Sequence, residues 1–136
     1  MVARELFVRP YRVLVSDDDE GCRESVREAL AGQGYEMRLA SCGREAIEVV
    51  RHHFIHVMIV DMNMADMSGL DTVSVIRREI SARVPSILMS ADASRELMSE
   101  ALSAEFDSFI AKPFDISALR RIVEEVLRRH YESNVF

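Results

Sequence analysis

Short apolar runs alternate along the chain with longer segments in which apolar residues recur every three or four positions. The runs lie at 12–16, 35–40, 56–60, 86–90 and 107–111. The segments between them have the spacing of a single apolar helix face. The clearest of these segments contains, in order, Leu119, Ile122, Val123, Val126 and Leu127. The pattern therefore predicts five strands, each followed by a helix.

Residues that favour helix ends stand where the pattern changes. Gly34 follows the first helical segment, where a glycine accepts the positive φ that often ends a helix. Ser68 and Asp71 resemble a capping box in which aspartate replaces the usual glutamate. Asp115 precedes the last helical segment and is a candidate N-cap. These boundaries agree with the alternation of strands and helices.

The order of these elements indicates the fold class. Strands that alternate with helices predict a parallel sheet that is covered by helices on both faces. Because crossover connections are right-handed, few arrangements remain for such a chain. We therefore expect an α/β fold built on a doubly wound, five-stranded parallel sheet. In sheets of this kind, ligands bind beyond the carboxyl ends of the strands, where the strand order reverses.

Polar residues follow four of the five apolar runs. Three aspartates, 17–19, come directly after the first run, and Asp61 comes directly after the third. The fourth run ends in Ser90, and the fifth is followed by Lys112. Because the carboxyl ends of parallel strands meet at one edge, we expect these side chains to lie close together.

These side chains suit phosphoryl transfer. Two carboxylates about 4 Å apart repel each other by roughly 4 kcal/mol at an effective dielectric constant of 20, so such a cluster protonates or binds a cation. Carboxylate oxygens suit Mg²⁺, which takes only one or two carboxylates and keeps several waters. A metal ion and Lys112 would neutralise the charge on a phosphoryl group, and a carboxylate is able to accept that group as an acyl phosphate.

Composition narrows the partners and the compartment. The 136 residues fit one domain, 49% of them are apolar, and the net charge is −6. An acidic chain does not suit nucleic acid or an anionic membrane as its main partner. We find no signal peptide and no apolar stretch of membrane-spanning length, so we expect a cytoplasmic protein. All but one of the 17 basic residues are arginine, and the exception is Lys112.

Four segments, taken together, resemble the receiver domain of bacterial two-component response regulators. They are, in chain order, VLVSDDDEGCRESV, VMIVDMNMADMSGLD, ILMSA and FIAKPF. The resemblance covers roughly residues 11–130. It leaves 1–10 as an N-terminal extension and 131–136 as a C-terminal tail. The resemblance implies a flavodoxin-like (βα)5 fold with strand order 2-1-3-4-5.

The resemblance also implies roles for the residues at the strand ends. Asp61 corresponds to the phosphoacceptor, Asp18 to a direct Mg²⁺ ligand, and Asp17 to a ligand that acts through water. Asn63 corresponds to the residue whose backbone carbonyl binds the metal ion. Lys112 corresponds to the lysine that contacts a phosphoryl oxygen.

Further positions match the family's conformational switch. Ser90 and Phe109 correspond to a pair in which the hydroxyl moves to the phosphoryl group and the ring turns inward behind it. The Lys112–Pro113 bond corresponds to a peptide bond that is often cis. Asp19 matches no site residue, and we interpret it as a helix cap or a solvated charge.

Four positions depart from the family's pattern. Ala65 replaces the usual proline of the loop after the third strand, so a less rigid loop is expected. Ser16 stands where an apolar strand residue is common. Glu105 and Phe106 replace a usual Gly-Ala pair, so the resemblance does not predict the backbone conformation there. None of these changes removes a chemical group from the predicted site.

The implied function is a phosphorylation switch in a two-component system or phosphorelay. A sensor histidine kinase or a phosphotransfer protein would donate a phosphoryl group to Asp61, giving 4-aspartylphosphate. A downstream protein target would then read the switched surface, and the last helix is a candidate surface for a homodimer. Such a domain catalyses only its own phosphorylation and dephosphorylation, and it is not otherwise an enzyme.

Four alternatives to this function differ in how well they fit the sequence, and the first two fit it poorly. A haloacid dehalogenase-type hydrolase needs an aspartate two residues after the nucleophile, where this chain has Asn63. A flavodoxin-like cofactor binder needs a phosphate-binding loop after the first strand, where three aspartates would repel a phosphate. A phosphorylation-independent interaction module would use the same fold. The chain is also expected either to act alone or to be a receiver cut from a longer regulator or hybrid kinase.

Overall fold

The structure is a computed structural model that describes residues 10–80 and 83–132. Residues 1–9 of the predicted N-terminal extension and 133–136 of the predicted C-terminal tail lie outside the described residues. Of the helices that are described, none combines the length with the apolar character needed to cross a membrane.

Five strands alternate with five helices in the described part of the chain, as the pattern of apolar residues predicts. The strands are β1 (Arg12–Ser16), β2 (Glu36–Ala40), β3 (Val57–Asp61), β4 (Ser86–Ser90) and β5 (Ser108–Ala111). The helices are α2 (Glu20–Ala31), α3 (Gly43–His52), α4 (Gly69–Glu79), α5 (Arg95–Ser103) and α6 (Ile116–Tyr131). The strands differ from the predicted runs by at most one residue at either end.

All of the pairs in the sheet are parallel, and the strand order is β2-β1-β3-β4-β5. Both the doubly wound fold class and the predicted order are therefore confirmed. The order reverses between β1 and β3, which are neighbours in the sheet although β2 lies between them in sequence. The register sets Ser16 opposite Val60, so these two strands end side by side.

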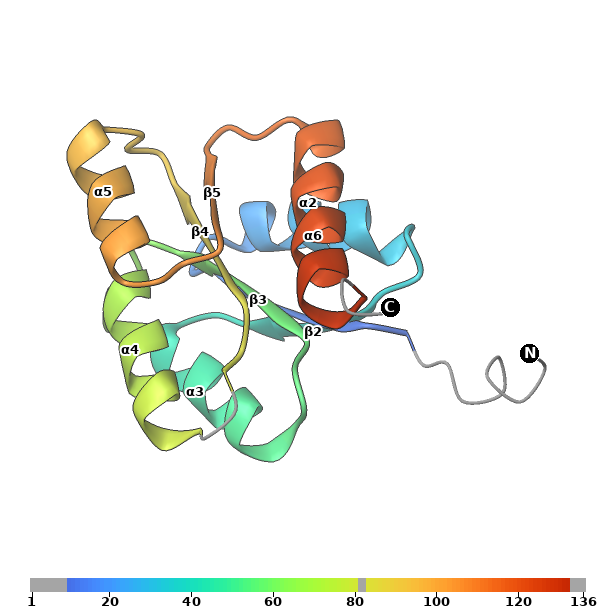
Figure 1. Cartoon of the computed structure of the whole chain (residues 1–136), viewed down its shortest axis with the longest axis horizontal. Coiled ribbons are helices and arrows are strands. Elements are labelled where there is room, and N and C mark those ends of the chain that lie inside the picture. Colours follow the sequence, from blue (N-terminus) through green and yellow to red (C-terminus); the bar gives the residue numbers. More distant parts are fainter. Residues whose placement is uncertain (1–9, 81–82, 133–136) are drawn as a thin grey trace.

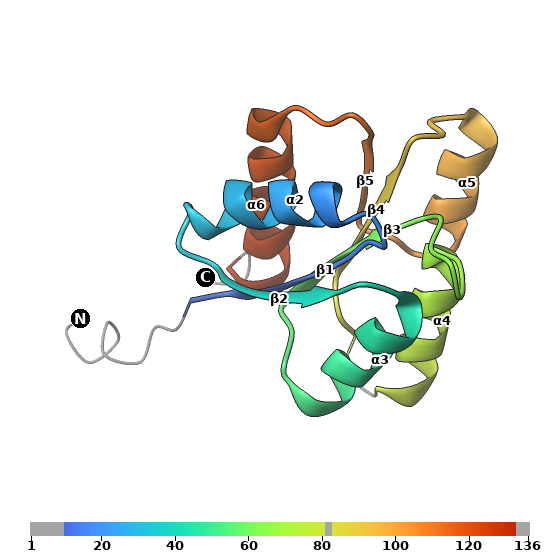
Figure 2. The ribbon, with the colours of Figure 1, turned by 180° about the vertical axis from the view of Figure 1, so that it is seen from behind.

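The helices cover the sheet on both faces (Figures 1 and 2). Helices α2 and α6 lie on one face, and α3, α4 and α5 lie on the other. Alternate strand residues contribute to two separate apolar cores because successive side chains of a strand point to opposite faces. Below α2 and α6, the strands contribute Val13, Val15, Val57, Ile59, Ile87, Met89 and Ile110. On the opposite face they contribute Leu14, Met58, Val60 and Leu88.

The predicted helix ends are largely confirmed. The side chains of Asp19, Ser68 and Asp115 each accept a hydrogen bond from a backbone N–H in the first turn of a helix. Gly34 has the predicted positive φ of 89°. It lies beyond the helix end, however, because α2 stops at Ala31 and a short turn separates the two residues.

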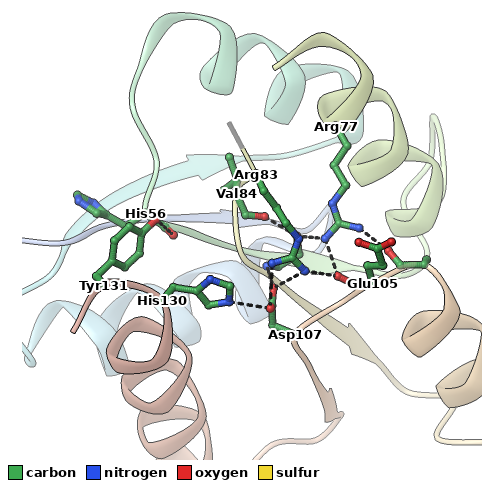
Figure 3. Close-up of polar contacts among 10 residues, drawn as sticks. His56, Arg77, Arg83, Val84, Glu105, Asp107, His130 and Tyr131 are labelled. Carbon is green, nitrogen blue, oxygen red and sulfur yellow. Dashed lines mark hydrogen bonds and ion pairs between the residues drawn. The ribbon is translucent and has the colours of Figure 1, made fainter. Parts of the chain in front are cut away.

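The Glu105–Phe106 departure is accommodated in the turn that precedes β5. Figure 3 shows Arg77 and Arg83 beside Glu105. Glu105 has a φ of 62°, so the left-handed backbone persists without a glycine. Arg77 and Arg83 each donate to the carbonyl oxygen of Glu105, at 2.7 Å, and Arg77 also donates to the carbonyl of Ala104. Phe106 is buried, with the Arg77 guanidinium 5.7 Å from the centre of its ring. Two guanidinium groups therefore hold the strained turn.

A glycine at position 105 is expected to stabilise this turn. Replacing Glu105 with glycine removes the clash that L-residues suffer at positive φ, while the two arginine contacts are to the backbone and remain. The relief exceeds the entropy that glycine adds to the unfolded chain, so we expect the free energy of unfolding to rise by about 0.5–1 kcal/mol. Urea denaturation measures this change. The Glu105→Ala variant is the control, since it keeps a Cβ, and an equal gain there would contradict the role of φ.

Candidate functional site

Three aspartates meet at the carboxyl ends of β1 and β3. Asp17 is fully buried, Asp61 is 5% exposed, and Asp18 is exposed. One carboxylate oxygen from each residue lies within 4.8 Å of the others. Asp17 and Asp18 directly follow β1, whereas Asp61 is the last residue of β3. The reversal of strand order between these strands therefore brings together the carboxylates that the sequence predicts at one edge.

Lys112 joins two of the aspartates from the end of β5. Its Nζ atom lies 2.9 Å from Oδ2 of Asp17 and 2.7 Å from Oδ1 of Asp61. Burial alone would lower the pKa of the Lys112 ammonium, but the two carboxylates outweigh burial and raise that pKa. Lys112 therefore stays protonated and holds a positive charge against Asp61.

Asp61 is held in an environment that disfavours its charge. Burial raises the pKa of its carboxyl, and the nearby charge of Asp17 adds to this effect. Hydrogen bonds from Lys112 and from the backbone of Asn63 oppose the rise without cancelling it. Three carboxylates and one ammonium leave the cluster with a formal charge of −2, and this excess favours binding of a cation. The donors are hard oxygens, which fit Mg²⁺.

The loop after β3 folds back over the end of that strand. The backbone N–H of Gly69 donates to the carbonyl oxygen of Met62 at 2.8 Å, and Asn63 pairs with Ser68 in an isolated antiparallel bridge. Gly69 is required here, because a Cβ atom on it would lie 2.5 Å from the carbonyl oxygen of Asp61. Asn63 is thereby exposed at the mouth of the site, next to the Asp61 carboxylate.

Ser90 and Phe109 lie on the two strands beyond β3. Met89 pairs with Asp61, so Ser90 is one residue further along β4; it is 1% exposed, and its Oγ accepts from the backbone N–H of Asp92. Phe109 is half-buried on β5, packs against the core under α5, and lines a groove of about 380 Å³. Ser90 therefore lies one strand away from Asp61, and Phe109 lies on the next strand, in a groove that α5 also lines.

Two further features complete the site. The Lys112–Pro113 peptide bond is cis, as the family resemblance implies. Cys22, in the first turn of α2, lies near enough to Asp17 for that carboxylate to raise the pKa of its thiol, a proximity that sequence reasoning missed. Burial, together with Asp17, raises the pKa of the Cys22 thiol to about 12, so the thiol stays protonated at neutral pH. Only its position one turn after the aspartates could have suggested this proximity.

Comparisons with known proteins identify the family to which the chain belongs. The family model of the response regulator receiver domain matches residues 13–124. The regulatory protein AtoC of Escherichia coli (strain K12) is 33% identical over 117 residues, which is 86% of this chain and 25% of AtoC. The uncharacterized transcriptional regulatory protein YrkP of Bacillus subtilis (strain 168) is 34% identical over 120 residues, which is 88% of this chain and 51% of YrkP.

Solved structures of similar proteins share the fold. The receiver domain of the Francisella response regulator 1452 has a TM-score of 0.83 and 27% identity, and the match covers 90% of this chain and 99% of that one. The chemotaxis response regulator CheY4 of Vibrio cholerae has a TM-score of 0.80 and 28% identity, with 87% and 99% covered.

Coverage is unequal between the two kinds of relative. The chain spans 25% of AtoC and 51% of YrkP, but nearly the whole of the solved receiver domains. What it shares with the longer proteins is therefore one domain, and that domain carries the aspartate cluster. The chain belongs to the response regulator receiver domain family.

Proposed function

We propose that this chain is a phosphoacceptor domain that takes a phosphoryl group from a phosphohistidine onto Asp61 in a Mg²⁺-dependent reaction. Receiver domains generally work as phosphorylation switches rather than as enzymes on other substrates. The observation that carries the proposal is the position of Asp61. Its largely buried carboxylate lies 2.7 Å from a protonated lysine and next to two further carboxylates.

The metal ion would be held by oxygen atoms that this chain already brings together. Asp17, Asp18 and Asp61 offer carboxylate oxygens, and the backbone carbonyl of Asn63 is the proposed fourth protein ligand. When bound, Mg²⁺ would neutralise negative charge on the phosphoryl oxygens. Asp17 is buried against Lys112, whereas Asp18 is exposed. By the family resemblance, Asp18 would bind the ion directly and Asp17 would act through a water molecule.

In the transfer step, one carboxylate oxygen of Asp61 attacks the phosphorus atom in line with the leaving nitrogen. A P–O bond forms, the P–N bond to the donor imidazole breaks, and the bonding electron pair returns to that nitrogen. Lys112 already contacts Oδ1 of Asp61, so its ammonium is placed to meet a phosphoryl oxygen on the new acyl phosphate. The product carries about −1.5 to −2 units of charge, by analogy with other phosphorylated residues.

That charge would act through Ser90 and Phe109. Ser90 is buried one residue beyond the strand partner of Asp61, and its hydroxyl accepts from Asp92. We propose that the hydroxyl turns to the phosphoryl group as a donor and that the half-buried Phe109 ring moves inward behind it. The surface around α5 and β5 would then differ between the two states, and a downstream protein target would read that difference.

The partners proposed for this chain follow from the family and from its charge. Response regulators interact with histidine kinases or phosphotransfer proteins, so one of these would supply the phosphoryl group. The net charge of −6 favours protein targets over direct contact with nucleic acid. Helix α6 is a candidate homodimer surface, and the reducing cytoplasm is the proposed compartment.

Incubation with acetyl phosphate and Mg²⁺, followed by intact mass measurement, tests the proposal. We expect one phosphoryl group per chain, and we expect none when the metal is removed with a chelator. If no adduct forms and beryllofluoride does not bind either, the chain is a phosphorylation-independent interaction module. A colourless purified protein would separately exclude a bound flavin.

A further inference from the structure

The loop between β3 and α4 is tied to a helix on another part of the chain. Asp66 accepts hydrogen bonds from the first two backbone N–H groups of α3, those of Gly43 at 2.9 Å and Arg44 at 2.7 Å. Cys42 occupies the N-cap position of α3 and makes no side-chain cap hydrogen bond. A carboxylate from the loop that follows the phosphoacceptor strand therefore caps α3 in place of a local residue.

Two more contacts join the same segments. The hydroxyl of Ser16, buried at the end of β1, lies 3.2 Å from the carbonyl oxygen of Cys42 and 3.1 Å from Sδ of Met64. Gly43 is packed so closely that a Cβ atom on it would overlap the side chain of Met67. The loop is thus fastened to the start of α3 by a carboxylate, a hydroxyl and a close van der Waals contact.

Two of the departures from the family's pattern meet in this arrangement. Ala65 lacks the ring that would fix φ at the usual proline position, so the loop has more backbone freedom than a proline would allow. Ser16 provides a hydroxyl where an apolar residue is common, and that hydroxyl reaches both fastened segments. Contacts across the fold therefore take over the restraint that the missing proline would have given.

We propose that Asp66 is a positioning residue that holds the β3–α4 loop, and with it the backbone of Asn63, in the conformation that binds the metal ion. The part of this inference that concerns the metal rests on the proposed function. Asp66 is exposed and bonds to the start of α3 rather than to Asp61 or Lys112, so it acts through the loop. Asn63 lies three residues before it, inside the segment that the Asn63–Ser68 bridge closes.

The charge of the Asp66 carboxylate stabilises its hydrogen bonds to the start of α3. Partial burial would raise the pKa of the Asp66 carboxyl, but the backbone N–H groups of Arg44 and Gly43 outweigh this and lower that pKa. A carboxylate at a helix N-terminus also meets the positive end of the helix dipole. Without the Asp66 carboxylate, the loop would populate other conformations. The apparent affinity for a metal ion would then fall in proportion to the population of the loop conformation that binds it.

The test compares three variants with the wild type. Asp66→Ala removes the tether. Asp66→Ala with Cys42→Ser restores a local cap for α3, because Cys42 has the extended backbone of an N-cap, but it leaves the loop free. Asp115→Ala removes the cap of α6, which lies outside the loop, and controls for loss of a helix cap in general. Amide hydrogen exchange without metal and Mg²⁺ titration by NMR are measured on all three.

We expect faster exchange across Met62–Ser68 and a Mg²⁺ dissociation constant raised about three- to tenfold in both variants that lack Asp66. We expect Asp115→Ala to show neither change. Recovery of both quantities by the added Cys42→Ser change, or unchanged values in Asp66→Ala, would overturn the proposal. If the wild type binds no Mg²⁺, the proposed function fails, and the exchange rates still decide whether Asp66 holds the loop.

Discussion

The Asp61→Asn variant is expected to form no phosphoryl adduct with acetyl phosphate and Mg²⁺ under conditions that modify the wild-type chain fully. An amide oxygen is not a nucleophile toward phosphorus at neutral pH, whereas the carboxylate is. Asparagine has nearly the same shape as aspartate, and its Oδ1 atom still accepts from Lys112. The fold should therefore survive while the reaction is lost, and intact mass measurement reports the result directly.

Asp19→Asn is the matched control for this substitution. Asp19 belongs to the same acidic run, but its side chain caps α2 by accepting from the backbone N–H of Gly21 at 3.0 Å. Asparagine is an equally good N-cap, so helix stability is retained. We expect Asp19→Asn to be phosphorylated like the wild type. An adduct of undiminished yield in Asp61→Asn would mean that another residue accepts the phosphoryl group.

Removal of Lys112 is expected to have the second large effect. In Lys112→Met, Asp17 and Asp61 lose the ammonium that contacts both of them. Without divalent metal, we expect the free energy of unfolding to fall by about 2–3 kcal/mol, below the usual range for fully buried pairs because the Lys112 side chain is 21% exposed. Urea denaturation with and without Mg²⁺ measures the loss, and Mg²⁺ should stabilise the variant more than the wild type.

Lys112→Arg separates charge from shape. A guanidinium keeps the positive charge, so most of the stability should remain, but its planar fork replaces a compact ammonium and phosphorylation should slow. The free energy of unfolding lost in Lys112→Met should also be smaller when Asp61→Asn is present, because fewer buried charges are then left unpaired. If Lys112→Met unfolds at the same urea concentration as the wild type in the absence of metal, the cluster does not depend on the lysine for its stability.

Much of the fold and the centre of the site could be predicted from the sequence. Fully buried parallel strands read as short apolar runs, so β3 and β4 were visible in VMIV and SILM. Because these strands are parallel, their carboxyl ends had to meet at one edge. That requirement alone predicts that Asp17, Asp61 and Lys112 lie together.

The long-range polar contacts could not be predicted in the same way. The bonds from Asp66 to α3 and from Arg77 to the Glu105 turn join residues that are far apart in sequence and follow no period. Each contact depends on how two segments that are distant in sequence pack together, and local helix or strand propensities do not predict this packing. The same holds for Gly34, whose positive φ was predicted but whose place in a turn beyond α2 depends on where the helix ends.

The most direct test of the proposal is to locate the phosphoryl group. Chains treated with acetyl phosphate and Mg²⁺ are reduced with borohydride, which converts an acyl phosphate on aspartate into homoserine and releases phosphate. The protein is then digested and its peptides are sequenced by mass spectrometry. We expect homoserine at position 61, in the peptide that contains the end of β3, and at no other aspartate. Homoserine at position 17 or 18, or unmodified Asp61 in chains whose intact mass shows an adduct, would contradict the proposed function.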